Sequence, residues 1–371
     1  MRVAISVPAF LRAADYGGPV TKVALLAKAL ADRGHAVTVL TADYGPARSR
    51  VPADTVVANG YTTHYLKTLA RYRWIPVLAP GQLRRIDWDV DVVHVCGLRD
   101  GLGIAVISAA RRRSIPYVVE PMGMGPAEFR SARLKAAVDR LVTGRQLGAA
   151  ASVIATSGRE RDLLNGQYDL ERIDVRPNPV AVSDAPPSAK VATPGAPIDV
   201  LFVGRICRTK GLPALVEAVT ALEGVRLTIA GPDDADGTSE QLRARASALP
   251  PGRLDMRGWV TPHERDELIA SSDICVLPSI TENFGNFAVE AAARRRPVVV
   301  TRTSGVAEFL EDAAMVVEPT VDALRAAIGR LVADPALRDS LAERGLQRAA
   351  ALGPATIAQA QEDIYARALH G

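Results

Sequence analysis

Three cations and two glycines form a compact turn near the middle of the chain, Gly204–Gly211. The turn reads GRICRTKG and follows an apolar run, 200–203, that is typical of a buried strand. Arg205 and Lys210 offer positive charge beside the start of a helix, where backbone N–H groups also attract anions. Neither the glycine spacing nor the order of lysine and threonine fits a P-loop. The turn therefore predicts a diphosphate site, with a solvated basic turn as the alternative.

Two glutamates, Glu282 and Glu290, have seven residues between them and follow a second apolar run, 274–277. We expect Glu282 in the loop after that run and Glu290 about one turn inside the next helix. A carboxylate accepts hydrogen bonds from paired sugar hydroxyls. Backbone N–H groups around Gly285–Phe287 can hold an anion at the helix start. The bare spacing is common, but its place after a strand favours a sugar and phosphate site.

A third motif, the glycine pair Gly17 and Gly18, follows the first apolar run and opens a helix expected over 20–33. Glycines at this place let a ligand approach the backbone near a helix N-terminus. The pattern is not GxGxxG, so it gives little support to a dinucleotide site, and a plain turn is the alternative.

Short apolar runs alternate with helical patterns along the chain, which predicts parallel sheets with right-handed crossovers. The alternation breaks at 181–197, a stretch rich in Pro, Ala and Ser that has the composition of a linker. The chain is therefore expected to form two doubly wound α/β domains of similar size. Strands are expected at 3–7, 36–41, 92–96, 117–119, 152–156, 200–203, 226–230, 254–257, 274–277 and 298–301.

The composition of the 371 residues, 48% hydrophobic and 23% charged, excludes wholesale disorder. Three widely spaced cysteines exclude a disulfide scaffold and a cysteine zinc site, and they fit a reducing compartment. With no apolar run of about 18 residues, we expect a cytoplasmic protein.

Residues 1–183 carry 25 Lys and Arg against 16 Asp and Glu, and residues 184–371 carry 20 against 25. This imbalance would be explained by two modules with different partners, or by a variation in surface charge that has no functional meaning.

Taken together, these motifs resemble the retaining glycosyltransferases of family 4, the glycosyl transferases group 1, which have the GT-B fold. The similarity runs in order over nearly the whole chain, and the ENFGN…E block together with GR…KG is its most specific part. The matching stretches are Gly17-Gly18 with the following helix, GHAVTVLT (34–41), DVVHV (91–95), IATSGRERDLL (154–164), VGRICRTKG (203–211), TIAGP (228–232), RGWV (257–260), LPSITENFGNFAVEAAA (277–293) and PVVVTRTSGVAEFL (297–310).

The resemblance implies two Rossmann-like domains facing a cleft. Residues 1–182 with 354–371 would form the acceptor-side domain, and 183–353 would bind the nucleotide-sugar donor. Arg205 and Lys210 would hold the diphosphate, Glu282 would lie near the donor sugar, and these three are the expected catalytic residues. Other expected donor contacts are Glu290 at the ribose, Trp259 and Val260 near the base, and Gly17, Gly18, Gly204, Asn283, Phe284, Gly285, Asn286 and Phe287.

The implied activity is transfer of a hexose from a nucleotide-diphosphate sugar to an acceptor hydroxyl with retention of anomeric configuration. Cationic side chains would replace a metal, and no cofactor besides the donor is expected. The acceptor would be a polysaccharide, glycolipid or natural product, and the basic first half favours an anionic or lipid-linked one. No nucleic-acid partner is expected. Alternatives are a GT-B epimerase or hydrolase, and a nucleotide-sugar-binding relative without turnover; a Rossmann oxidoreductase ranks third.

Some residues depart from the family pattern. Met122 stands where many members have histidine, and methionine cannot shuttle a proton. Either Glu120 compensates for the missing histidine, or a subfamily manages without it. Glu120 and Met122 are the candidate sugar or acceptor contacts. The triplet 294–296 replaces a common glycine and predicts only a changed helix end. Asp89-Val90-Asp91 is expected to be an acidic strand start and not a metal signature. The basic helix expected over 130–146 is interpreted as a domain helix, with peripheral membrane contact as the alternative.

Overall fold

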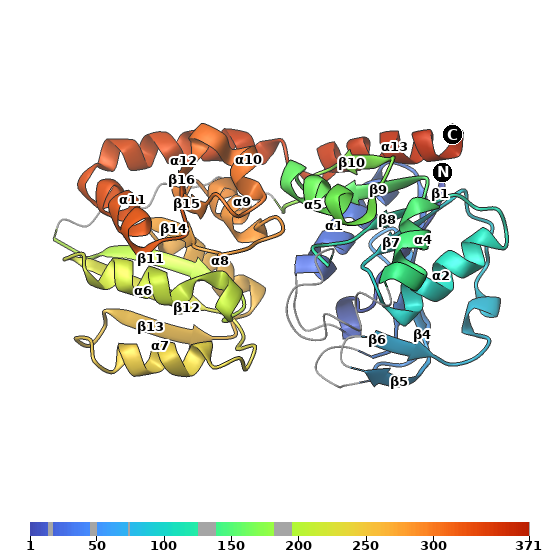
Figure 1. Cartoon of the computed structure of the whole chain (residues 1–371), viewed down its shortest axis with the longest axis horizontal. Coiled ribbons are helices and arrows are strands. Elements are labelled where there is room, and N and C mark those ends of the chain that lie inside the picture. Colours follow the sequence, from blue (N-terminus) through green and yellow to red (C-terminus); the bar gives the residue numbers. More distant parts are fainter. Residues whose placement is uncertain (14–17, 45–49, 73–74, 125–138, 182–194, 371) are drawn as a thin grey trace. The chain divides into compact units, whose positions relative to one another are not determined.

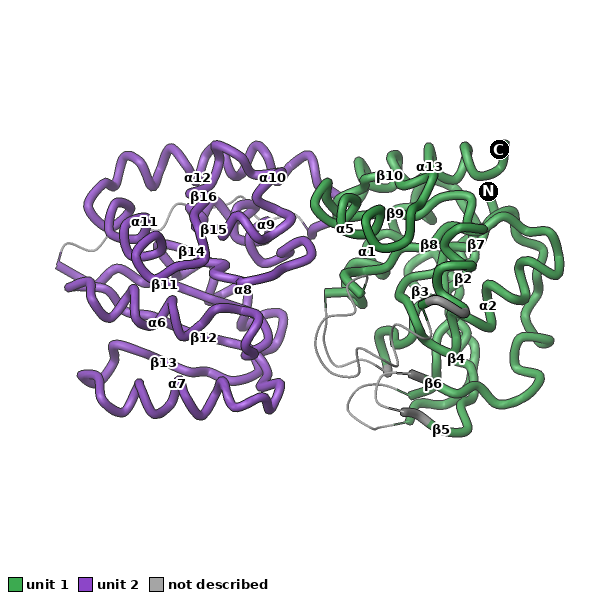
Figure 2. The backbone as a smooth tube through the Cα atoms, in the orientation of Figure 1, with its two compact units in different colours: residues 1–179, 354–371 green, residues 180–353 purple. Residues whose placement is uncertain are grey.

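The computed structural model describes residues 1–13, 18–44, 50–72, 75–124, 139–181 and 195–370 (Figure 1). The chain divides into two compact units (Figure 2). Unit 1 comprises Met1–Pro179 and Pro354–Gly371, and unit 2 comprises Val180–Gly353. The predicted boundary at residue 182 falls beside the observed one. The predicted linker lies mostly outside the described residues.

Unit 1 contains an eight-stranded sheet in the order β10-β9-β8-β7-β1-β2-β4-β3. Every neighbouring pair is parallel except β3 and β4. β5 and β6 follow β4 in the sequence and form a separate antiparallel pair. The strands are β1 Arg2–Ser6, β2 Ala36–Ala42, β3 Thr55–Ala58, β4 Tyr61–Leu66, β5 Thr68–Tyr72, β6 Ile75–Leu78, β7 Val92–Cys96, β8 Tyr117–Glu120, β9 Ser152–Ala155 and β10 Ile173–Val175.

Side chains alternate along β1 between two cores, as a strand covered on both faces requires. Val3 and Ile5 pack into one core with α1 (Gly18–Asp32) and α13 (Pro354–His370). Ala4 packs into the other core, with α2 (Gly101–Arg111) and residues from α4 (Gly144–Gly148) and α5 (Gly158–Tyr168). The C-terminal helix is thus part of unit 1. The other helical turns among the described residues of unit 1 are Leu11–Ala13, Gln82–Arg85 and the π-helix Asp139–Thr143.

Unit 2 has one parallel sheet in the order β13-β12-β11-β14-β15-β16, which is the strand order of a Rossmann fold. Its strands are β11 Ile198–Val203, β12 Val225–Ala230, β13 Leu254–Gly258, β14 Ile274–Leu277, β15 Val298–Thr301 and β16 Met315–Val317. Its α-helices are α6 Leu212–Thr220, α7 Thr238–Ala246, α8 Pro262–Ser271, α9 Asn286–Ala293, α10 Val306–Leu310, α11 Val321–Ala333 and α12 Pro335–Ala350.

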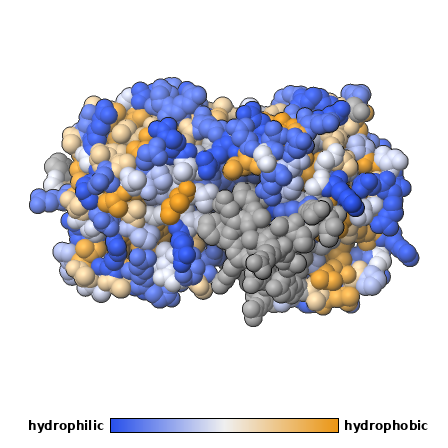
Figure 3. All heavy atoms as spheres, in the orientation of Figure 1, coloured by the Kyte–Doolittle hydropathy of each residue, from blue (hydrophilic) through white to orange (hydrophobic). Residues whose placement is uncertain are grey.

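The predicted fold class, two Rossmann-like α/β domains, is confirmed, and all ten predicted strands are present within one or two residues of their predicted ends. On the face seen in Figure 3, apolar residues lie in small patches between hydrophilic ones. Among the helices of the described residues, none has the length and apolar character needed to cross a membrane.

Candidate functional site

The strand order of unit 2 reverses between β11 and β14, which pair directly through Val200 and Ile274. In open α/β sheets, ligands bind beyond the carboxyl ends of the strands at such a switch point. The predicted diphosphate turn follows β11, and the loop with Glu282 follows β14. The two are hydrogen-bonded to each other, because Ile280 N donates to Thr209 O over 2.8 Å. The fold therefore brings together two motifs that lie about 70 residues apart in the sequence.

Glycines allow the two segments to approach this closely. Gly211 has a φ of +64°, and a Cβ at this position would lie 2.1 Å from Pro278 O. Gly285, with a φ of +105°, precedes α9, and a Cβ there would lie 2.5 Å from a Leu277 methyl carbon. A side chain at either position would strain the backbone. At Gly211 it would also collide with the loop after β14, and at Gly285 with Leu277 and Val306. The pattern of glycines in the two motifs is thus explained by close packing at the switch point.

Lys210 and Glu282 form an ion pair at this point. Their side chains are 14% and 16% exposed, so the pair is largely shielded from water. Ser279 Oγ also donates a hydrogen bond of 3.2 Å to Glu282 Oε2. The structure therefore brings two of the three expected catalytic residues into direct contact.

The third, Arg205, points elsewhere. Its Nη1 lies 2.9 Å from Asp234 Oδ2, and the Arg205 side chain is 56% exposed. Asp234 follows β12, and the nearby Asp236 accepts a hydrogen bond of 2.8 Å from Arg208 N. Sequence reasoning did not identify this acidic loop, although its place directly after a strand beside β11 was a usable signal. In this structure the two predicted diphosphate cations thus each face a carboxylate.

Glu290 lies in the second turn of α9 and is 12% exposed. Burial raises the pKa of its carboxyl group, while Arg265 and Arg294 oppose that rise. Arg265 Nη1 lies 3.3 Å from Glu290 Oε2. Arg265 comes from the first turn of α8, and sequence reasoning missed it because nothing in the motifs marks it.

Several predicted donor residues do not offer their side chains to a ligand. Phe284 is 2% exposed and Phe287 is 7% exposed. Phe287 packs edge-to-face on Phe202, with ring centroids 6.2 Å apart. A donor contact at Phe284 or Phe287 would therefore have to come from the backbone. Asn283 and Asn286, in contrast, are half-buried.

The predicted base contacts lie after β13. Trp259 is 47% exposed and Val260 is half-buried. Both line a surface groove with residues of α8, including Glu264 and Leu268. Gly204 directly follows β11, and a Cβ at this position would lie 2.9 Å from the Phe202 ring.

In unit 1, Gly18 is the exposed first residue of α1, and Gly17 lies outside the described residues. Met122 has a φ of +57° and packs partly against the core between the sheet and α1. Its neighbour Gly123 donates a backbone hydrogen bond of 2.9 Å to Glu160, a buried carboxylate that also accepts from Thr156. The side chain of Met122 is thus half-buried against the core, and the backbone beside it is held by Glu160.

The expectation that Glu120 contacts sugar or acceptor is wrong for this structure, because its side chain has no exposed surface. One carboxylate oxygen contacts Lys22 Nζ, and the other lies 2.6 Å from Arg176 Nη2. Burial alone would raise the pKa of Glu120, but Arg176 and Lys22 hold it well below its ordinary value. Both partners are themselves buried. Glu120 therefore serves as the counter-charge of two interior cations.

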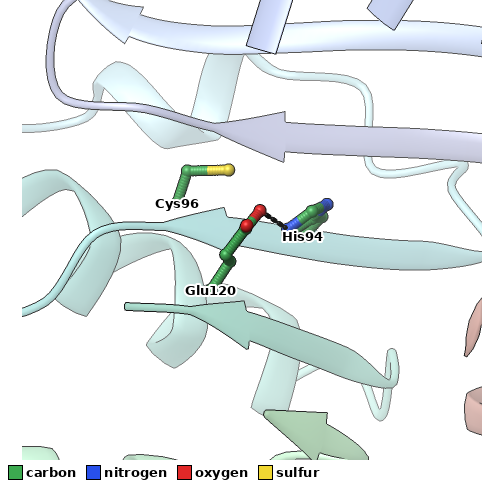
Figure 4. A group of neighbouring side chains, drawn as sticks. All are labelled: His94, Cys96 and Glu120. Atoms are coloured by element: carbon green, nitrogen blue, oxygen red, sulfur yellow. Dashed lines mark ion pairs between the residues drawn. The ribbon is translucent and has the colours of Figure 1, made fainter. Parts of the chain in front are cut away.

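His94, Cys96 and Glu120 lie together on β7 and β8 (Figure 4). His94 Nε2 lies 3.3 Å from Glu120 Oε2, and its Nδ1 lies 2.8 Å from the Tyr365 hydroxyl of α13. Burial raises the pKa of the Cys96 thiol, which disfavours the thiolate form that binds metals. The carboxylate is already neutralised by two cations. These donors fit an internal polar network, and they do not fit a metal site.

Three other sequence interpretations concern surface features. Asp89 and Asp91 both pair with Arg2, so this acidic pair stabilises a strand start, as expected. At the end of α9, Arg295 has a φ of +56° at the position where glycine is common, which is the changed helix end that was predicted. The basic helix expected over 130–146 lies mostly outside the described residues, and its described end forms Asp139–Thr143 and α4.

Comparisons with known proteins identify the family of this chain. The family model described as "Glycosyl transferases group 1" matches residues 197–334, and that described as "Glycosyl transferase 4-like domain" matches residues 17–179. D-inositol 3-phosphate glycosyltransferase of Xylanimonas cellulosilytica is 31% identical over 311 residues, which cover 78% of this chain and 69% of that protein. The chain belongs to the group 1 glycosyltransferases. Three other curated glycosyltransferases are matched over only 43% to 52% of their own lengths.

Solved structures place this group 1 glycosyltransferase in the GT-B fold. Sucrose-phosphate synthase from Thermosynechococcus elongatus superposes with a TM-score of 0.78 at 21% identity, covering 98% of both chains. Anabaena Alr3699/HepE, in complex with UDP and glucose, superposes with a TM-score of 0.73 at 17% identity, covering 97% of this chain and 98% of that one.

Proposed function

We propose that this group 1 glycosyltransferase moves a hexose from a nucleotide-diphosphate sugar to an acceptor hydroxyl with retention of anomeric configuration. The observation that carries the proposal is the Lys210–Glu282 pair at the switch point of unit 2, beside the start of α9. A donor placed there would meet a cation, a carboxylate and backbone N–H groups together. The solved complex of Alr3699/HepE with UDP and glucose supports this type of donor.

The proposed chemistry needs stabilisation of a leaving group. Breaking the sugar–phosphate bond adds negative charge to the diphosphate. Lys210, the α9 N-terminus and Arg205, once released from Asp234, would stabilise that charge as it develops. Retention would follow from attack on the face of the leaving group, with a phosphate oxygen taking the acceptor proton. In this scheme the side-chain cations do the work of a metal, and the reaction needs no cofactor besides the donor.

We further propose that the acceptor carries phosphate or another anionic group. The first half of the chain, which contains most of unit 1, has nine more cationic than acidic side chains. An anionic acceptor would be attracted to a basic surface. The name of the Xylanimonas relative, which specifies D-inositol 3-phosphate, supports a phosphorylated acceptor.

The proposal is tested by thermal shift with UDP, GDP, ADP and their hexose conjugates, each with and without EDTA. Because a ligand stabilises the state that binds it, the donor nucleotide should raise the melting temperature, and EDTA should leave that shift unchanged. The best donor is then incubated with inositol phosphate, a sugar phosphate and an uncharged sugar. Anomeric proton NMR of the product reads the stereochemistry. Inversion, or no shift with any nucleotide, would refute the proposal.

A nucleotide-sugar-binding relative without turnover is the second candidate, and Met122 favours it. A thioether replaces the usual histidine, and the buried Glu120 does not take over its contacts. Such a protein would show the thermal shift but release no nucleoside diphosphate with any acceptor. Donor consumption without acceptor would instead indicate an epimerase or hydrolase.

A further inference from the structure

Glu290 belongs to a circuit of four charged side chains that the sequence motifs do not reveal. Arg265 Nη1 lies 3.3 Å and 3.4 Å from the two carboxylate oxygens of Glu290. Arg265 Nε lies 3.6 Å from Asp266 Oδ1, and Arg294 Nη2 lies 2.8 Å from the same oxygen. Arg294 Nη1 closes the circuit with a 3.0 Å hydrogen bond to the main-chain oxygen of Glu290. The circuit ties the first turn of α8 to the C-terminal half of α9.

Two opposing effects act on the pKa of the Glu290 carboxyl group. Burial favours the neutral acid and raises the pKa, and the neighbouring Asp266 acts in the same direction. Arg265 and Arg294 favour the carboxylate and lower the pKa. Of these two, only Arg265 is placed against the carboxylate oxygens, since Arg294 contacts Asp266 and a main-chain oxygen. Arg265 is therefore the main source of charge stabilisation at Glu290.

The contact also leaves room for a ligand. A carboxylate offers about four lone-pair sites. Arg265 places a single nitrogen between the two oxygens of Glu290, at distances longer than those of a bidentate pair. Acceptor capacity remains for two adjacent hydroxyls. A protonated carboxyl would lose much of that capacity, because one of its oxygens would become a donor.

We propose that Arg265 is a positioning residue, which keeps Glu290 ionised and oriented to accept both ribose hydroxyls of the donor and so sets the preference for ribonucleotides. This inference rests on the proposed function, in which Glu290 contacts the ribose. Arg265 itself does not touch the nucleotide.

The test compares a nucleoside diphosphate with its 2′,3′-dideoxy analogue. The probe is whichever of UDP, GDP and ADP stabilises the wild-type chain most, and affinities are measured by calorimetry between pH 5 and pH 8. The variants are Arg265→Gln, Arg265→Lys and, as a surface control in α11, Arg325→Gln. The preference for the ribose form is the ratio of the two dissociation constants, which cancels any general loss of folded protein.

At pH 7 we expect Arg265→Gln to lose about tenfold in that preference, the size of one charge-assisted hydrogen bond. Affinity for the dideoxy analogue should change less than about twofold. The preference of the Gln variant should also decline at a higher pH than in wild type, because its carboxyl group protonates more readily. Arg265→Lys should retain most of the preference, and Arg325→Gln all of it. A purely structural role would lower both affinities together and leave the pH profile in place.

Asp266→Asn should shift the pKa of Glu290 in the opposite direction to Arg265→Gln. Removing this carboxylate leaves Arg265 to Glu290 alone, so the ribose preference should persist to a lower pH than in wild type. An unchanged preference and pH profile in Arg265→Gln would overturn the inference while leaving the proposed function intact. Equal wild-type affinity for both analogues would remove the ribose role of Glu290 and the inference with it. Absence of any nucleotide binding would refute the proposed function itself.

Discussion

The Lys210–Glu282 pair gives the sharpest prediction. The two side chains are 14% and 16% exposed, so each charge depends mainly on the other for stabilisation. Lys210→Met removes the cation and leaves the glutamate shielded from water without its partner. An unpartnered, largely buried charge costs about 1–3 kcal/mol. For a domain of this size, we expect the melting temperature of unit 2 to fall by about 5 °C.

The same change should damage function far more than stability. Loss of one preorganised group that meets developing charge typically costs about 10²–10³ in kcat. Scanning calorimetry gives the stability, and release of nucleoside diphosphate gives kcat/KM. The double variant Lys210→Met with Glu282→Gln has no unpaired charge, so it should regain most of the lost stability and none of the activity. Recovery of activity in the double variant, or wild-type kcat/KM in Lys210→Met, would refute the reasoning.

Four further predictions follow from single contacts. Gly211→Ala would place a Cβ 2.1 Å from Pro278 O, and it should destabilise unit 2 by about 2 kcal/mol or more in urea unfolding. Glu120→Gln leaves two buried cations without their counter-charge and should cost about 3–5 kcal/mol in the same assay. Glu290→Gln should weaken nucleoside diphosphates but not free pyrophosphate, as measured by thermal shift; equal loss would count against the ribose role. Burial raises the pKa of Asp100 from 3.8 to about 6, so binding a proton at Asp100 stabilises the folded state. This stabilisation is complete below pH 4 and is lost as the pH rises through 6. Asp100→Asn should remove this pH dependence.

Most of the ten predicted strands were predictable because they are apolar runs buried inside a sheet, although β13, with the sequence LDMRG, is a half-buried edge strand. The sequence does not mark β3, β4 and β10 in the same way. β3 and β10 are largely exposed or half-buried, and β4 alternates buried residues with polar ones such as His64. β16 has three residues, which is too short for any periodicity. Strands without a continuous apolar run were therefore not predicted, whether they lie at an edge of the sheet, as β3 and β10 do, or next to an edge strand, as β4 does.

The candidate site was predictable where its residues follow central strands. Lys210 and Glu282 both occupy loops at the switch point, and strand order alone brings them together. Side-chain partners from other segments were not predictable. Arg265 has no motif of its own. Asp234 follows a predicted strand, but its pairing with Arg205 depends on a distance that only the folded chain provides. Glu120 was misinterpreted for the same reason, because Lys22, its buried partner, lies 98 residues earlier.

Arg205 and Lys210, in the turn after β11, are proposed to bind the diphosphate of the donor. The most direct test is the ratio of affinities for a nucleoside diphosphate and its nucleoside, measured by calorimetry in the wild-type chain and in the double variant Arg205→Ala with Lys210→Ala. The nucleotide is whichever of UDP, GDP and ADP stabilises the wild-type chain most. We expect wild type to bind the diphosphate far more tightly than the nucleoside, and the double variant to bind both almost equally. A double variant that keeps the wild-type ratio would contradict this proposal.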